Sequence, residues 1–208
     1  MLTSLSVNDF LDEIASPSPA PGGGSVSALA ATFGAALTSM VCCLTIGKKK
    51  YADVQSEMEK VLKQSEELRA HFKAIIDEDT AAYNKVMSAY GLPKDTEEQK
   101  SKRTAEIQEA MKTATIVPLK LMGHCMEAMK LVQIIAEQGN QNSLSDAGVA
   151  ALMLHAGCEG AALNVLINLN CMQDKVFVEA KRAIANTIRT SVSDDFQLIL
   201  YRINGKVF

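Results

Sequence analysis

Residues 25–46 contain no charged side chain, and this run of 22 residues constrains the fold more than any other feature of the chain. Lys48, Lys49 and Lys50 follow it, so the segment superficially resembles a membrane span with a positive flank. Ala and Gly are abundant in the run, however, and six Ser and Thr side chains lower its preference for lipid. We therefore expect no membrane partner. A helix without a polar face must then be surrounded by protein, at the centre of a bundle or in a subunit interface.

The composition favours a single helical domain, which we expect to span positions 1–208. Apolar residues make up 48% of the chain, but aromatic residues only 5%, and Trp is absent, a balance that favours helices over strands. The net charge is −3, and the chain has no zinc-finger or helix-turn-helix pattern, so we expect no nucleic-acid partner.

Cysteine and histidine usage bears on the compartment and on metals. Five cysteines without a Cys-x-x-Cys pair are typical of reduced thiols, and the first residues show no secretory signal, so we expect a cytoplasmic protein. His71, His124 and His155 lack the spacing of a metal site, and we predict no metal.

Hydrophobic periodicity and helix signals predict an all-helical chain in which Pro118 kinks or divides one helix. Residues 16–24, rich in Pro and Gly, should lack regular structure. The predicted helices cover residues 6–14, 25–46, 53–90, 95–138, 143–168 and 175–203. The expected fold class is an antiparallel helical bundle with two long helices. We expect it to form a homodimer, because a second copy would cover the long helices.

Asp79 is the most informative single residue, because helical periodicity places it on an apolar face between Phe72, Ile76 and Tyr83. A carboxylate on a buried face must find a partner or shift its pKa. Two interpretations remain open: a structural ion pair with a lysine, and a role in a functional site.

The glycine run before the apolar helix is a candidate binding loop. Gly22, Gly23 and Gly24 lead directly into Ser25, where free backbone N–H groups favour an anion or a polar ligand. The same run is equally consistent with a flexible linker.

Polar residues also gather at both ends of the predicted helix that follows residue 142. Asn140, Ser145 and Asp146 lie at its start, where Asp146 also suits a simple capping role. Asn164 and Asn168 lie four residues apart on one apolar face near its end. A continuous helix rises about 27 Å between Asp146 and Asn164. The two ends can serve one site only by gripping opposite ends of a long ligand or by coming from two subunits.

Five motifs together resemble one known family. In order they are PSPAPGGGSVSALAATFGAAL, LTIGKKKY, DTAAYNKVMSAYGLPK, GNQNSLSDAGVAAL and GAALNVLINL. Their order and spacing are similar to those of the C-terminal domain of formiminotransferase-cyclodeaminase and its single-domain relatives. The resemblance extends from about Ser6 to about Asp194. It implies an all-helical subunit that forms homodimers, with folate sites at or near the subunit interface.

The resemblance implies an enzyme of folate one-carbon metabolism. The leading hypothesis is 5-formiminotetrahydrofolate cyclodeaminase, which gives 5,10-methenyltetrahydrofolate and ammonia. Methenyltetrahydrofolate cyclohydrolase is the close alternative, and a non-catalytic helical interaction subunit is an alternative of another class. The tetrahydrofolate derivative is the substrate, and no separate cofactor is expected.

Both reactions need a proton shuttle and an anion beside a delocalised cation, so we place Asp79 and Asp146 in catalytic roles. The lysines would contact the glutamate tail of the folate. The expected substrate-binding residues are Gly22, Gly23, Gly24, Ser25, Lys48, Lys49, Lys50, Asn140, Ser145, Asn164 and Asn168.

Overall fold

The computed structural model describes residues 1–207, and every regular element in that range is a helix. In chain order the elements are η1 (Leu2–Ser4), α1 (Val7–Ala15), α2 (Gly23–Cys43), η2 (Lys49–Val54), α3 (Gln55–Tyr90), α4 (Glu97–Gln138), η3 (Gln141–Ser143), α5 (Leu144–Asn170) and α6 (Lys175–Val207). The prediction of an all-helical chain with two long helices is thus confirmed, since α3 has 36 residues and α4 has 42.

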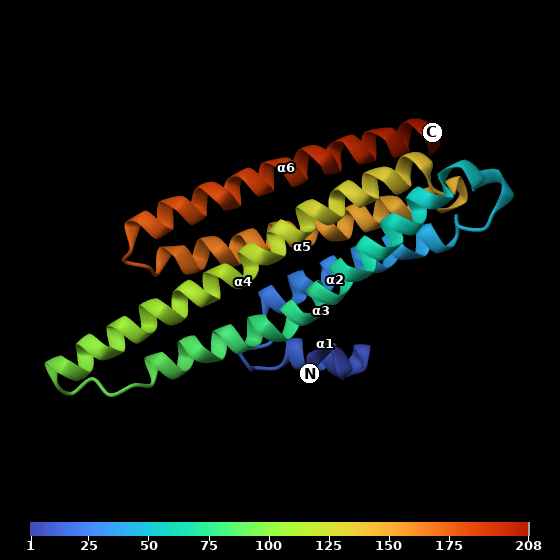
Figure 1. The fold of residues 1–208 in the computed structure, drawn as a ribbon. Helices are drawn as coiled ribbons and strands as arrows, with labels where there is room; N and C mark the ends of the chain where they lie inside the picture. The colour runs from blue at the N-terminus through green and yellow to red at the C-terminus, as the bar shows by residue number, and fades with distance from the viewer. Residues whose placement is uncertain (208) are drawn as a thin grey trace.

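The helices form a bundle in which α2 and α5 are central. α2 packs against α3 and α5, α4 packs against α3 and α5, and α6 lies along α4 and α5 (Figure 1). The connection between α3 and α4 extends beyond the other helices. We name this extension, residues 82–113, the hairpin arm. It contains a small apolar cluster of its own, Val86, Ala89, Ile107 and Met111, separate from the main core.

Small residues let α2 and α5 approach closely. A Cβ atom on Gly157 would lie 2.8 Å from the backbone oxygen of Ser27, and one on Gly34 would lie 2.6 Å from Leu154 Cγ. Neither distance is compatible with a side chain at the glycine. The uncharged run therefore forms a core helix because its small residues allow close packing.

One local prediction was wrong. Gly23 and Gly24 belong to the first turn of α2 and not to the irregular stretch before it, because tertiary contacts hold them there. Of the two effects predicted for Pro118, a kink or a division of the helix, division is excluded, because α4 continues through the proline. At the start of α5, Ser143 is the N-cap residue, and its side chain makes no capping hydrogen bond.

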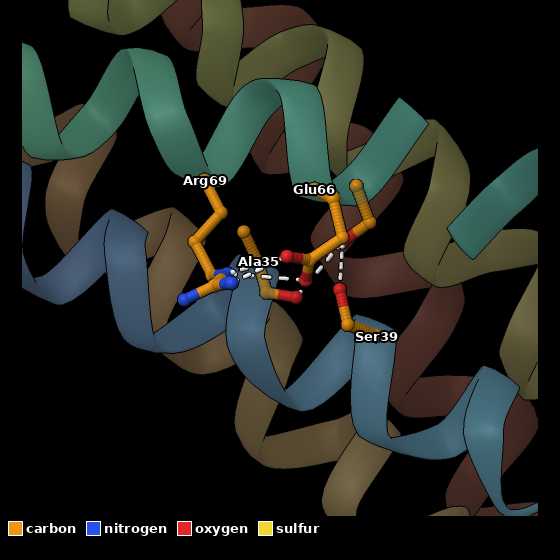
Figure 2. A network of polar contacts seen from close by, with 5 residues as sticks. Ala35, Ser39, Glu66 and Arg69 are labelled. Atoms are coloured by element: carbon orange, nitrogen blue, oxygen red, sulfur yellow. Dashed lines mark hydrogen bonds and ion pairs between the residues drawn. The ribbon is translucent and has the colours of Figure 1, made fainter. Parts of the chain in front are cut away.

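A polar network joins α2 to α3 within the bundle. Ser65 Oγ donates to the backbone oxygen of Ala35 at 2.8 Å, and Ser39 Oγ donates to Ser65 Oγ at 3.1 Å (Figure 2). Arg69 forms an ion pair with Glu66 beside this network. Both buried serine hydroxyls are therefore hydrogen-bonded, which explains how polar residues are accommodated between these helices.

α2 and α5 each leave an apolar stripe uncovered. Length and composition would allow α2 and the segment Gln141–Asn170 to cross a membrane, yet 50% and 44% of their most apolar windows are buried inside the bundle. Core helices of a soluble bundle have the same properties. The exposed apolar side chains are Val26, Phe33 and Met40 on α2, Leu44 directly after it, and Val149, Leu152, Leu163 and Ile167 on α5.

Candidate active site

A pocket of about 370 Å³ lies where the N-terminus of α2 meets α3, α4 and α5. Its polar side chains are Asp79 and Tyr83 from α3 and Asn164 and Asn168 from α5, and the glycines that begin α2 form another wall. Among the described residues, no Lys, Arg or His lines it. The volume falls within the range of small-molecule sites, about 300–1,000 Å³.

Asp79 is held by the first turn of α2. Ser25 Oγ lies 3.1 Å from Asp79 Oδ2 and 3.0 Å from the backbone oxygen of Ile76. Burial raises the pKa of Asp79, although hydrogen bonds from the hydroxyl and backbone N–H of Ser25 oppose this effect. No ion pair within residues 1–207 includes Asp79. The site therefore presents a carboxylate that no lysine or arginine neutralises.

Gly24 lies directly against this carboxylate. A Cβ atom on Gly24 would lie 2.1 Å from Asp79 Oδ1 and 2.5 Å from Asp79 Cγ. A residue with a side chain at position 24 would displace the carboxylate, so the absence of a side chain lets the helix N-terminus meet Asp79 directly. The partial positive charge of that N-terminus favours the ionised form of Asp79.

Asn164 and Asn168 form the wall contributed by α5. Asn168 Nδ2 donates to the backbone oxygen of Ala114 at 2.8 Å, which ties α5 to α4. Asn164 Nδ2 donates to the backbone oxygen of Gly160 at 2.8 Å. Both side chains are half-buried.

Asn140 lies at the opposite end of the bundle. Its Oδ1 accepts from Tyr51 Oη at 3.3 Å and from the N–H of Asn142 at 3.1 Å, while its Nδ2 donates to the backbone oxygen of Leu44 at 3.0 Å. The side chain is buried and joins the α2–α3 connection to the α4–α5 connection. These hydrogen bonds occupy both ends of the amide.

The lysines lie at this same end, beyond α2. Lys48, Lys49 and Lys50 are exposed, and α2, with 21 residues, separates them from the pocket by about 30 Å. Ser145 and Asp146 lie in the first turn of α5 and do not line the pocket. The structure thus brings together seven predicted site residues: Gly22, Gly23, Gly24, Ser25, Asp79, Asn164 and Asn168. In one subunit it separates them from Asn140, Ser145, Asp146 and the lysines.

Tyr83 was not among the predicted site residues, although it lines the pocket. It follows Asp79 by four residues, so it shares a helix face with the carboxylate. That spacing could have identified Tyr83. The apolar pattern instead suggested a core position.

A larger hollow, of about 840 Å³, lies between α3 and α4. It is lined by Lys85, Lys102, Glu106 and Glu109, which belong to solvent-facing positions of the hairpin arm. We place the site at Asp79 because chemistry depends on a desolvated ionisable group more than on volume. Within residues 1–207, no group of three His, Cys, Asp or Glu side chains is arranged to hold a metal ion.

Known proteins resemble this chain over its full length. The sequence profile of the Formiminotransferase-cyclodeaminase family matches residues 6–187. A methenyltetrahydrofolate cyclohydrolase from Methylorubrum extorquens is 50% identical over 175 residues, 84% of each protein. The formimidoyltransferase-cyclodeaminase of Rattus norvegicus is 37% identical over 205 residues, 99% of this chain but 38% of the rat protein. The crystal structure of a formiminotetrahydrofolate cyclodeaminase from Thermotoga maritima, 31% identical, matches with a TM-score of 0.91 and full coverage of both chains. The chain belongs to the formiminotransferase-cyclodeaminase family.

Proposed function

We propose that the chain is an enzyme of folate one-carbon metabolism that acts at the carbon bridging N5 and N10 of tetrahydrofolate, with its reacting centre in the Asp79 pocket. The observation that carries this proposal is a partly buried carboxylate, without a cationic partner, in a cleft that no Lys or Arg of the described chain lines. Such a cleft favours a ligand that carries or develops positive charge.

The two reactions of the family pass through the same cation. In cyclohydrolysis, water adds to the methenyl carbon and loses a proton, and the bond from that carbon to N5 then breaks as N5 gains a proton. In cyclodeamination, N10 attacks the carbon of the protonated formimino group and gives up its own proton, the amino nitrogen gains that proton, and the bond from the carbon to this nitrogen breaks as ammonia leaves. Asp79 would stabilise the cation and exchange that proton. The bridging carbon keeps its oxidation state in both reactions, so neither needs a redox cofactor.

Similarity to the named relatives favours cyclohydrolysis. The relative named a cyclohydrolase is 50% identical, whereas those named cyclodeaminases are 37% and 31% identical. Cyclodeamination remains the second candidate, because the match to the cyclodeaminase structure covers both chains completely.

One assay with two substrates tests the proposal. Purified protein is given 5,10-methenyltetrahydrofolate, and the decay of its near-ultraviolet absorbance is compared with the spontaneous rate. In parallel, it is given 5-formiminotetrahydrofolate, and the rise of the same absorbance is followed. Turnover of either substrate supports the proposal and assigns the reaction. Turnover of neither would leave the non-catalytic interaction subunit as the surviving alternative.

We also propose a homodimer that buries the exposed apolar stripes of α2 and α5. Contiguous exposed apolar faces of this kind mark subunit interfaces. A second subunit would also give Asp146 a possible place in the site. Asp146 is too far from the Asp79 pocket of its own subunit and could approach such a pocket only from a partner chain. The same argument applies to Lys48, Lys49 and Lys50 as contacts for a folate tail.

Leu163→Glu is expected to convert this dimer to a monomer, because Leu163 is 66% exposed in the single chain and would be buried in the dimer. Sedimentation velocity at micromolar concentration measures the change. Leu198→Glu, on the outer helix α6, is the matched control and should leave the dimer intact. A wild-type protein that is active and monomeric would contradict the dimer proposal.

A cytoplasmic location is proposed as well. All five cysteines are unpaired, and Cys42, Cys125 and Cys158 are buried, with burial as the main cause that raises the pKa of each thiol. Unpaired thiols of this kind are typical of a reducing compartment.

A further inference from the structure

Pro118 leaves one backbone carbonyl of α4 without its helical donor. In an α-helix, the carbonyl of residue 114 accepts from the N–H of residue 118, but proline has no N–H. Asn168 Nδ2 donates to the oxygen of Ala114 at 2.8 Å. A side chain from α5 therefore replaces the hydrogen bond that α4 lacks.

This bond fixes the orientation of the Asn168 amide. Turning the amide over would place its oxygen against the oxygen of Ala114, which is repulsive and leaves that carbonyl unsatisfied. The orientation of the Asn164 amide is fixed in the same way, because its Nδ2 donates to the backbone oxygen of Gly160 at 2.8 Å. In the part of the chain that the structure describes, neither amide oxygen accepts a hydrogen bond.

With both nitrogens engaged, each amide keeps its oxygen, an acceptor, as its free polar atom. The pocket that both asparagines line also contains the Asp79 carboxylate, Tyr83 and the first residues of α2, and no Lys or Arg lines it among residues 1–207. A ligand that hydrogen-bonds to the two asparagines must therefore supply the donors. A bound ligand without N–H groups would leave these oxygens desolvated and unpaired, and sites built for hydrogen bonds strongly reject such ligands.

We propose that Asn164 and Asn168 are specificity-determining residues whose amide oxygens read N–H donors along one edge of a planar heterocycle. The proposal rests on the function proposed above for the identity of that ring, the pterin, whose 2-amino group and ring N–H groups form a donor edge. Pro118 is the positioning element, because its missing N–H commits the Asn168 nitrogen to Ala114.

The donor requirement can be measured without turnover. 6,7-Dimethyltetrahydropterin and its 2-desamino analogue are titrated into the wild-type protein by isothermal calorimetry. The amino compound is expected to bind at least about tenfold more tightly, because the analogue leaves acceptors unpaired. Equal affinities would overturn the proposal.

Variants at position 168 test whether Asn168 causes the difference in affinity between the two pterins. Asn168→Leu alone leaves the Ala114 carbonyl unpaired and risks unfolding, so it is made together with Pro118→Ala, which restores an N–H to that carbonyl. Pro118→Ala alone, which frees the Asn168 amide to turn, should reduce the preference for the amino compound about two- to fivefold. The double variant should lose most of the remaining preference for the amino compound. A double variant that discriminates as well as Pro118→Ala would refute the role of Asn168.

Two comparisons distinguish this inference from a general change in the fold and from the proposed function. Asn186→Leu, on the exposed face of α6, should keep the wild-type preference for the amino compound. If this variant also loses the preference, the effect comes from a general change in the fold and the role of Asn168 is refuted. Discrimination between the two pterins without turnover of either folate would support the inference and contradict the proposed function. Turnover without discrimination would do the reverse.

Discussion

Asp79→Asn is expected to lower kcat/KM for the folate substrate at least about 100-fold, with the helical fold intact. The amide is nearly isosteric, but it carries no negative charge and cannot exchange a proton with the reacting group. Loss of a positioned acid or base typically lowers rates by about 10²–10⁴. The near-ultraviolet assay measures kcat/KM, and circular dichroism checks the fold.

The same substitution should stabilise the protein at neutral pH. Burial raises the pKa of Asp79 in the folded state above its unfolded value of 3.8. A group with a raised folded pKa contributes stability that is fully present below the unfolded pKa and is lost as the pH rises through the folded pKa. The neutral amide avoids this loss. The Tm of Asp79→Asn should therefore exceed that of the wild type at pH 7, and the difference should shrink as the pH falls toward 3.8.

Glu78→Gln is the matched control on the same helix. Glu78 pairs with Lys120 at 3.2 Å, and both side chains are more than 40% exposed, so the pair contributes little. Its loss should change neither turnover nor Tm appreciably. If Asp79→Asn retains wild-type turnover, Asp79 is a structural residue and the proposed mechanism fails.

Gly24→Ala is expected to lower kcat/KM about 100-fold by a different route. The added Cβ would lie 2.1 Å from Asp79 Oδ1, so the carboxylate must leave its position against the α2 N-terminus. Displacement of a catalytic group by about 1 Å can reduce the rate by about 10². Alanine is the better helix former, which offsets part of any loss of stability. A crystal structure of the variant would show the displaced carboxylate.

Gly123→Ala provides the control for this glycine substitution. Gly123 lies within α4, and a Cβ atom there meets nothing within 4 Å. Turnover should stay at the wild-type level, and stability should rise slightly. Full activity in Gly24→Ala would show that the contact between Gly24 and Asp79 does not matter for the reaction.

Local pattern predicted the elements well because helix signals are local. The uncharged run identified α2 as a core helix, and α4 begins at Glu97, two residues after the predicted start, behind a Thr96–Gln99 capping box. Pro118 shows the limit of local rules. The donor that replaces its missing N–H comes from Asn168, 54 residues from Ala114 in the sequence. No local pattern reveals such a partner.

The site was only partly predictable for a related reason. Periodicity singled out Asp79, and the distance along one helix showed that Asp146 and Asn164 cannot share a small centre in one subunit. The sequence did not show which end of α5 meets Asp79, because that depends on how α5 packs against α2. Gly24 illustrates the point: its importance comes from its distance to Asp79 and not from its place in a glycine-rich stretch.

We expect the hairpin arm to couple ligand occupancy to local unfolding. Its apolar cluster is separate from the main core, although Met172 packs against both, so we expect this part of α3 and α4 to open more readily than the rest of the bundle. Tyr83, Val86 and Met111 of the arm line the pocket. A bound pterin would therefore contact both the arm and the rest of the bundle and would stabilise the closed arrangement. Amide protons of the arm should exchange with solvent more slowly when the pocket is filled, while those of α6 keep their rates.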